Sequence, residues 1–243
     1  MPAKHTPGII CEFLCRRQVV RFFVSNLGDT VQNRHFNGGF YEAEELSIIE
    51  AHLKPGGVFL DLGANVGNHA VFVAKFCRPG TVILIEPNPE ALRHLRANLL
   101  LNRLDLDVRH LGLGLSDHAE AADVAWQPNN LGGARMTARE GGAIPLVTGD
   151  SLLADRHIDF MKIDIEGHEI KALNGLERTI AASRPKIFIE VDDENRPAFE
   201  AWREAHDYTT LKTFRRYRIN ENVLIAPTET LKAAGLAAAS KPE

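Results

Sequence analysis

The sequence predicts an α/β fold: a doubly wound, mostly parallel twisted sheet with helices on both faces and an antiparallel strand pair at its carboxyl end. Over residues 58–206, short apolar runs alternate with segments of helical periodicity. Continuous apolar runs indicate strands buried on both faces, which is typical of parallel sheets. Two further strand-like runs, 208–214 and 223–226, follow without a helix between them, as antiparallel neighbours do. The chain has 243 residues, 44% of them hydrophobic, and can bury such a core.

Residues 1–57 are expected to lead into this sheet. Residues 19–25 are rich in β-branched and aromatic side chains and are followed by turn-forming residues, so we expect a strand or hairpin there. Further on, Leu46, Ile49 and Leu53 recur at spacings of three and four residues. This spacing places them on one face of an amphipathic helix.

The core is expected over residues 58–227, where glycine and proline separate alternating strands and helices. The predicted elements are strands at 58–62, 81–85, 108–111, 158–163 and 186–191, and helices at 68–76, at 86–101 with its opening turn, from about 169, and at 196–206. Residues 113–149 break this rhythm with paired asparagines and glycines, so we expect an inserted hairpin or lid there. The alanine-rich residues 228–243 are expected to form a C-terminal tail.

Charge and apolar runs narrow the class of function. Lys and Arg number 28 against 32 Asp and Glu, a net charge of −4, so no overall basic field attracts nucleic acid. No apolar run approaches the roughly 18 residues that a membrane helix needs, and the amino-terminal segment lacks a signal-peptide core. We therefore expect a cytoplasmic protein that binds neither nucleic acid nor membrane. The sequence leaves the oligomeric state open.

The loop after the first core strand carries the strongest functional signal. Gly63 and Gly67 allow the backbone to approach a ligand closely, just before a helix whose first N–H groups are unpaired. Asn65 stands where a dinucleotide fingerprint has its second glycine, so a nicotinamide cofactor is disfavoured. The loop is expected to bind another nucleotide-like molecule. An ordinary tight turn is the structural alternative.

Two acids favour S-adenosylmethionine as this ligand. Asp61 lies inside an apolar strand, where a carboxylate is costly unless it meets a cation or hydrogen-bond donors. S-adenosylmethionine carries an ammonium and a sulfonium and no phosphate, so an acid beside the loop suits it. Glu86 closes the second strand, 19 residues beyond Gly67, where its carboxylate can accept from both ribose hydroxyls. Capping of the following helices is the competing interpretation of both acids.

Several segments also match a known family pattern: Gly39-Phe40-Tyr41-Glu42, residues 58–69, Glu86-Pro87, Leu115-Ser116-Asp117 and, most specifically, residues 161–169 with the sequence MKIDIEGHE. Together they resemble the FkbM family of S-adenosylmethionine-dependent methyltransferases over residues 22–227. The resemblance implies a Rossmann-like class I methyltransferase fold and methyl transfer, in characterised members to a hydroxyl oxygen. It also implies a cofactor site that includes Asn68, Ser116 and Asp117. Asp207-Tyr208 replaces the usual Gly-Tyr and residues 131–133 lie in a variable segment, which leaves the acceptor open.

The acceptor side is expected at the ends of the fourth and fifth strands. The two-residue period of a strand puts Lys162 and Asp164 on one face, and Glu190 lies on the next strand. With Glu166 and His168, these residues are expected to converge on one cleft. O-methylation needs in-line approach and removal of the hydroxyl proton, for which Asp164 and His168 are the candidate bases. In the structural alternative, Lys162 pairs with one of the acids and Glu166 caps the next helix.

The sequence leaves two questions open: whether the site holds a metal ion, and what the residues around the amino ends of two helices contact. Asp164 and Glu190 could hold a Mg²⁺-like ion that lowers the pKa of the acceptor hydroxyl, although we favour a route without metal because Lys162 can neutralise the pair. His69 and the Tyr41-Glu42 pair are candidates for contacts with the acceptor or with the methionine end of the cofactor. Their alternative role is to begin their own helices.

The sequence therefore predicts a methyltransferase that acts on a hydroxyl of a small molecule, a sugar or a polyketide-like acceptor. A nucleic-acid base methyltransferase is an alternative, but such enzymes commonly carry an Asn/Asp-Pro-Pro-aromatic loop where this chain has Asp164-Ile165-Glu166-Gly167. A cofactor-binding protein without catalysis is a third reading. It would not need the polar acceptor cleft that Asp164 and Glu190 suggest.

Overall fold

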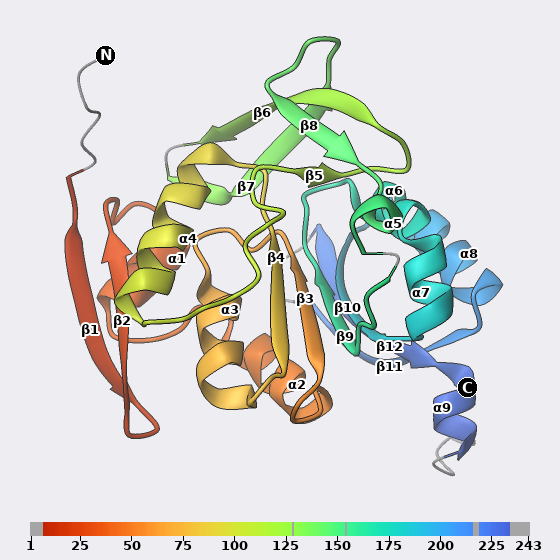
Figure 1. Cartoon of the computed structure of the whole chain (residues 1–243), viewed down its shortest axis with the longest axis horizontal. Helices are drawn as coiled ribbons and strands as arrows, with labels where there is room; N and C mark the ends of the chain where they lie inside the picture. The colour runs from red at the N-terminus through yellow and green to blue at the C-terminus, as the bar shows by residue number, and fades with distance from the viewer. Residues whose placement is uncertain (1–6, 128, 154, 216–218, 234–243) are drawn as a thin grey trace.

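The computed structural model describes residues 7–127, 129–153, 155–215 and 219–233. At its centre is a six-stranded sheet (Figure 1), made of β11 (Tyr208–Phe214), β12 (Asn220–Pro227), β10 (Lys186–Asp192), β9 (Phe160–Ile163), β3 (Val58–Leu62) and β4 (Thr81–Ile85), in that order. Strands β4, β3, β9 and β10 are parallel, whereas β10, β12 and β11 pair in antiparallel fashion. The predicted mostly parallel sheet with an antiparallel pair at its end is confirmed.

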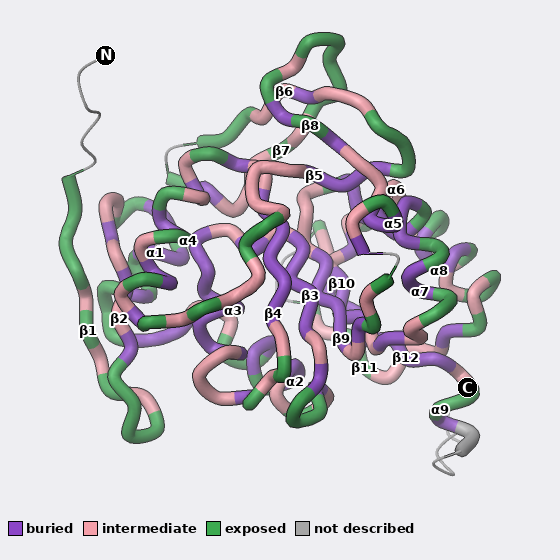
Figure 2. Tube along the Cα trace, in the orientation of Figure 1, coloured by how far each residue is buried: buried purple, intermediate pink, exposed green. Residues whose placement is uncertain are grey.

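The two faces of the sheet carry two separate apolar cores, because successive residues of a strand point to opposite sides. Phe59, Phe160 and Phe188 pack on one face against α2 (Ala43–His52), α3 (Asn68–Phe72), the π-helical turn Val73–Cys77 and α4 (Pro89–Leu101). The opposite face packs against four helices, namely α5 (Gly149–Leu153), α6 (Glu169–Gly175), α7 (Glu177–Ser183) and α8 (Arg196–Ala205). Figure 2 shows the central strands as buried between these layers.

The amino-terminal lead-in is a hairpin followed by two helices. The strand predicted at residues 19–25 is observed as β2 (Gln18–Val24), and it pairs in antiparallel register with β1 (Ile9–Cys15), a strand that was not predicted. Asn98 of α4 and Asn102, which caps the end of that helix, hydrogen-bond the backbone of β2 and hold the hairpin against the core. A short helix, α1 (Thr30–Phe36), which the sequence analysis did not predict, leads to α2.

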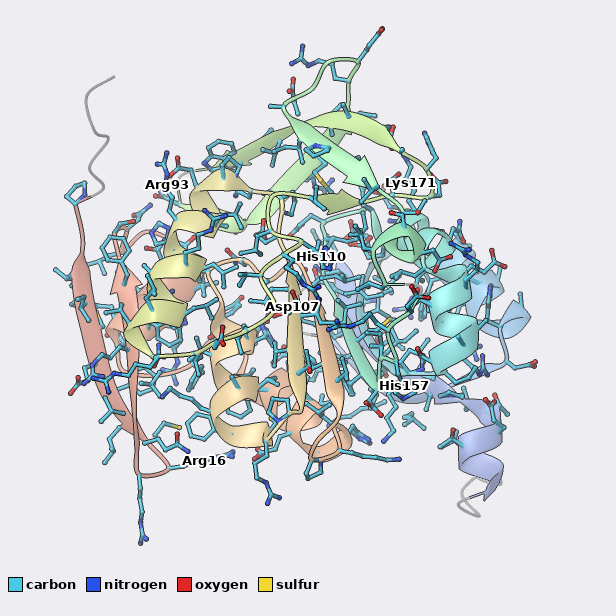
Figure 3. The ribbon with its side chains drawn as sticks, viewed as in Figure 1. Arg16, Arg93, Asp107, His110, His157 and Lys171 are labelled. Atoms are coloured by element: carbon cyan, nitrogen blue, oxygen red, sulfur yellow. The ribbon has the colours of Figure 1, made fainter. Side chains whose placement is uncertain are left out.

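The expected strand at residues 108–111 is wrong. These residues form turns, and the single bridge to β4 is made by Asp107, whose N–H donates to the Val82 carbonyl at 2.9 Å. Asp107 and His110 lie beside β4 (Figure 3). The segment contains Arg109 and His110, which are not buried, so it cannot continue as a strand covered on both faces.

Residues 113–149 contain a second, smaller sheet. Its strands are β5 (Gly114–Leu115), β8 (Ile144–Val147), β6 (Glu120–Gln127) and β7 (Asn130–Ala138), in that order. It lies across the carboxyl ends of β3 and β4 (Figure 1). Its behaviour as a mobile lid stays a prediction. At the other end of the chain, α9 (Thr228–Ala233) follows β12, and the rest of the expected tail lies outside the described residues.

Candidate active site

The glycine loop after β3 is shaped by close backbone contacts. Gly63 has φ = +81°, and a Cβ atom there would lie 1.8 Å from the carbonyl oxygen of Asp164. Gly67 has φ = +88°, and a Cβ atom would lie 2.7 Å from the side chain of Leu95. Both positions therefore require glycine, for conformation and for space. The loop is held directly against the end of β9.

Glu86, at the end of β4, is prepared to accept hydrogen bonds from a ligand. Its two carboxylate oxygens accept the backbone N–H groups of Asn65 and Asn88, at 2.8 and 2.7 Å. Burial raises the pKa of Glu86 to about 7, and these two N–H groups oppose the rise. Each oxygen keeps a further acceptor site. The contact of Glu86 with the ribose of the cofactor stays a prediction.

Two cavities meet at the glycine loop. The larger has a volume of about 360 Å³ and is lined by residues from the loop, from the starts of α2 and α3, and from the ends of β9 and β10. The smaller, about 40 Å³, is lined by Glu86, by Leu131 and Met136 of β7, and by the end of β9. Both are lined by Gly63, Asn65, Gly132, Asp164 and Glu166.

A buried ion pair supports the floor of the larger cavity. Asp61 and Lys162 lie opposite each other in β3 and β9, and the Lys162 Nζ is 3.8 Å from the Asp61 carboxylate. Lys162 also contacts the Asp164 carboxylate at 3.1 Å and the Gly63 carbonyl at 3.4 Å. Burial raises the pKa of Asp61 to about 6, and Lys162 opposes that rise. Asp61 thus meets a cation, as its position required, but that cation is Lys162, and Asp61 does not itself line either cavity.

Three carboxylates crowd together beside Lys162. Oxygen atoms of Asp164, Glu166 and Glu190 lie within 4.8 Å of one another, which makes the group able to hold a divalent cation. Burial and the neighbouring acids raise the pKa of Glu166 to about 8 and that of Glu190 to about 9. The Asn220 amide donates to Glu190 at 2.7 Å. The predicted convergence of Lys162, Asp164, Glu166 and Glu190 is therefore observed.

His69 is a site residue to which the sequence analysis gave only a secondary place. It lies in the first turn of α3, is 6% exposed, and lines the larger cavity. Its Nε2 has no hydrogen-bond partner and lies 3.7 Å from the Glu42 carboxylate. Burial, followed by the charge of Lys162, lowers the pKa of His69 well below its usual value. The sequence signal was its position two residues after Gly67.

Other predicted site residues lie elsewhere. His168 lines neither cavity, and its Nε2 lies 3.3 Å from the Met136 carbonyl of β7. Ser116 is buried and donates to Glu120, and Asp117 is exposed; neither lines the two cavities. These residues belong to the contact between the smaller sheet and α6, where Lys171 lies on the outer surface (Figure 3).

Asn68 lines the larger cavity, but its amide is already engaged. It accepts from the Tyr41 N–H and donates to the Tyr41 carbonyl, both at 2.9 Å, and its Oδ1 lies 3.0 Å from the Nε2 of His35. Asn68 therefore fixes the backbone just before α2 and with it the position of Glu42. The arrangement gives it a positioning role, and its contact with the cofactor stays a prediction.

Comparisons with known proteins agree with this architecture. The FkbM methyltransferase domain matches residues 61–218, more than half of the chain. Hexuronic acid methyltransferase AglP of Haloferax volcanii is 26% identical over 166 residues, which are 66% of this chain and 65% of that protein. Methyltransferase sdnD of Sordaria araneosa is 24% identical over 163 residues, 52% of this chain and 63% of that protein. The chain thus spans just under two thirds of the length of these relatives.

A solved structure shows the same fold. The M. jannaschii tRNA m1G37 methyltransferase superimposes with a TM-score of 0.53 at 12% identity, covering 92% of this chain and 55% of that one. No helix in the part of the chain that the structure describes has the length and apolarity of a membrane span. The glycine loop, the acid at the end of β4 and the family match lead to one assignment. The chain belongs to the FkbM family of S-adenosylmethionine-dependent methyltransferases.

Proposed function

We propose that the chain transfers the methyl group of S-adenosylmethionine to a hydroxyl oxygen of a small polar acceptor, such as a sugar or a polyketide-like molecule. The observation that carries this proposal is that the larger cavity meets the cofactor loop at Gly63 and Asn65 and has a wall of hydrogen-bonding side chains. An acceptor in this cavity would lie beside the methionine end of the cofactor. The likeness to AglP, a hexuronic acid methyltransferase by name, supports a sugar.

The cofactor would lie along the glycine loop, with its ribose hydroxyls donating to Glu86. Glu86 lines only the smaller cavity, whose volume of about 40 Å³ is far too small for a nucleoside. Leu131 and Met136 of β7 form part of its wall. Entry of the adenosyl group therefore requires the β6–β7 hairpin to shift, which agrees with the expected lid.

In the reaction, the acceptor oxygen attacks the methyl carbon, the carbon–sulfur bond breaks with its electron pair passing to sulfur, and the hydroxyl proton passes to a base. Asp164 and Glu190 would hold the acceptor for in-line attack, since orientation supplies a large part of the rate. We favour a route without metal, because the Lys162 ammonium is only 3.1 Å from Asp164 and already offsets its charge. Full activity in the presence of EDTA is expected.

The charge of the cavity wall limits the acceptor. Glu42, Asp164, Glu166 and Glu190 line it, against Lys162 as the one lysine or arginine among its described lining residues. A carboxylate on the acceptor would bring a further negative charge to this cluster, in which the pKa values of Glu166 and Glu190 are already raised to about 8 and about 9, whereas a neutral or amine-bearing acceptor would not. We therefore propose an acceptor that differs in charge from the hexuronic acid of AglP.

The test uses S-adenosylmethionine with a labelled methyl group and a metabolite extract separated into anionic, neutral and cationic fractions. We expect label in the neutral or cationic fraction, with the methyl group on oxygen in the product. Transfer to the anionic fraction would contradict the proposed acceptor charge. Transfer to tRNA or DNA, added as a separate arm, would replace the proposed function with nucleic-acid methylation.

A further inference from the structure

We propose that His69, supported by Glu42, is the general base that removes the proton of the acceptor hydroxyl. This inference rests on the proposed function and names the group that its chemistry still lacks. Asp164 and His168 are the bases that the sequence predicts. The structure points to a different histidine, brought to the cavity by the start of α3.

The first step is the position of the imidazole. His69 is 6% exposed, lines the larger cavity and has an Nε2 without a hydrogen-bond partner. A buried polar atom left unpaired costs free energy, and most such atoms in folded proteins have partners. An acceptor hydroxyl in the cavity would provide the missing partner. Nε2 would then accept the hydroxyl hydrogen bond, with the imidazole proton on Nδ1.

Second, the other candidate bases already have contacts that compete with an acceptor hydroxyl. His168 lies beside the Met136 carbonyl and does not line the cavity. The Asp164 carboxylate is already engaged by the Lys162 ammonium, 3.1 Å away. Glu190 accepts from Asn220. These acids are better placed to orient the acceptor than to take its proton.

Third, methyl transfer removes a positive charge from the cofactor and creates one on the base. When the methyl group leaves, the positive charge of the sulfonium disappears, and a new positive charge forms on the imidazole that takes the proton. Glu42, whose carboxylate is 3.7 Å from Nε2, can stabilise that imidazolium. Of the other acidic and basic groups that line the same cavity, Lys162 opposes the imidazolium, Asp164 favours it, and Glu166 and Glu190 favour it when they are ionised. The acidic wall can therefore stabilise the positive charge of the sulfonium before methyl transfer and that of the imidazolium after it.

The fourth step is the return of the base to its starting state. Burial and Lys162 keep the His69 imidazole neutral in the resting protein. Once the product leaves and water enters the cavity, the imidazolium can release its proton to solvent. The base is then ready for the next turnover without help from another residue.

The experiment compares His69→Ala and His69→Gln with wild type in methyl transfer at saturating S-adenosylmethionine. We expect kcat to fall by roughly 10²–10⁴-fold in both, the usual contribution of a general base. Added imidazole should restore part of the rate of His69→Ala, in proportion to its unprotonated fraction, because a small base can enter the emptied position. Cofactor affinity, measured by calorimetry, should change by less than about threefold and also shows that the variants are folded.

His157→Ala is the matched control (Figure 3), since this exposed histidine precedes β9, whereas the cavity is lined by residues at the other end of that strand, and it should keep the wild-type rate. The inference is overturned if His69→Ala keeps a rate within about threefold of wild type, if imidazole restores nothing, or if the variant loses cofactor binding while kcat stays normal. The inference would also be overturned if His168→Ala lost the rate while the His69 variants kept it. Failure of the proposed function looks different, because wild type itself would then methylate no hydroxyl.

Discussion

Glu86 at the end of β4 and Glu190 near the end of β10 are glutamates in contrasting surroundings. Both oxygens of Glu86 accept backbone N–H groups of the loops beside it. Glu190 accepts from the Asn220 side chain and faces two further acids, Asp164 and Glu166. Burial is the largest cause of the raised pKa of each, which reaches about 7 for Glu86 and about 9 for Glu190.

This difference in surroundings distinguishes the proposed cofactor side from the proposed acceptor side. Around Glu86, backbone groups fix the geometry before any ligand arrives, as suits a cofactor that is the same in every turnover. Around Glu190, three acids lie close together and cannot all ionise without cost, so a ligand must bring the compensating donors or positive charge. The cofactor side is therefore pre-organised, whereas the acceptor side is completed by its ligands. Each prediction below tests one side of this comparison.

The largest effect is expected on the acceptor side. Asp164→Asn removes the charge next to Lys162 while keeping the shape of the side chain. It should lower kcat by roughly a hundredfold or more, because the acceptor loses a group that orients it and Lys162 loses its nearest counter-charge. Cofactor affinity should stay nearly unchanged, since the residue acts after cofactor binding. Methyl-transfer kinetics and calorimetry on the same preparation check both parts, and full activity in the variant would exclude Asp164.

On the cofactor side, Glu86→Ala should weaken binding of S-adenosylmethionine roughly 10–150-fold, or about 1.5–3 kcal/mol, the usual value of hydrogen bonds to a charged group. Glu90→Ala is the control, because Glu90 lies in α4 and pairs with Arg93 on the surface. Calorimetric titration of both variants measures the difference. Equal affinity in the Glu86 variant and wild type would remove this residue from the site.

A smaller effect is expected on stability without ligand. Folding raises the pKa of Glu190 from its usual 4.5 to about 9. The contribution of this group to the free energy of unfolding is therefore fully present below about pH 4.5 and is lost as pH rises through about 9. Glu190→Gln removes a group that resists ionisation. The melting temperature of the variant minus that of wild type should therefore be larger at pH 8.5 than at pH 6. Glu204→Gln, on the exposed surface, should show no such gain. An identical pH dependence in Glu190→Gln and wild type would contradict the crowding of the acids.

The smallest effect concerns the hairpin above the cofactor loop. If β6 and β7 shift to admit the adenosyl group, their amide hydrogen exchange should slow when cofactor binds. Strands β3 and β9 should change little. Hydrogen exchange followed by mass spectrometry resolves the two regions. Strong protection of the hairpin in the free protein, unchanged on binding, would rule out a mobile lid.

Much of the cofactor side could be predicted from sequence, because its features are local. Strands β3 and β4 have the predicted bounds, since each is a continuous apolar run between glycine or proline residues. Glu86 follows β4 directly, and the loop between Gly63 and Gly67 follows β3. Parallel neighbours bring these segments to one edge without any long-range information.

The acceptor side was predicted less completely, because it depends on contacts between distant segments. Glu166 and Gly167 have φ values of +52° and +97°, so the chain turns after β9 and the alternation of the strand no longer places His168. Glu42 and His69 come together because the Asn68 amide binds the backbone of Tyr41. No local pattern announces such a contact.

The central claim is that the loop after β3 and Glu86 hold the cofactor so that its methyl group faces the acid-lined cavity. A crystal structure of the protein with S-adenosylhomocysteine tests it most directly. We predict ribose hydroxyls within hydrogen-bond distance of Glu86 and the sulfur directed toward Asp164 and His69. A nucleoside bound elsewhere, with Glu86 still contacted only by its backbone partners, would contradict the account.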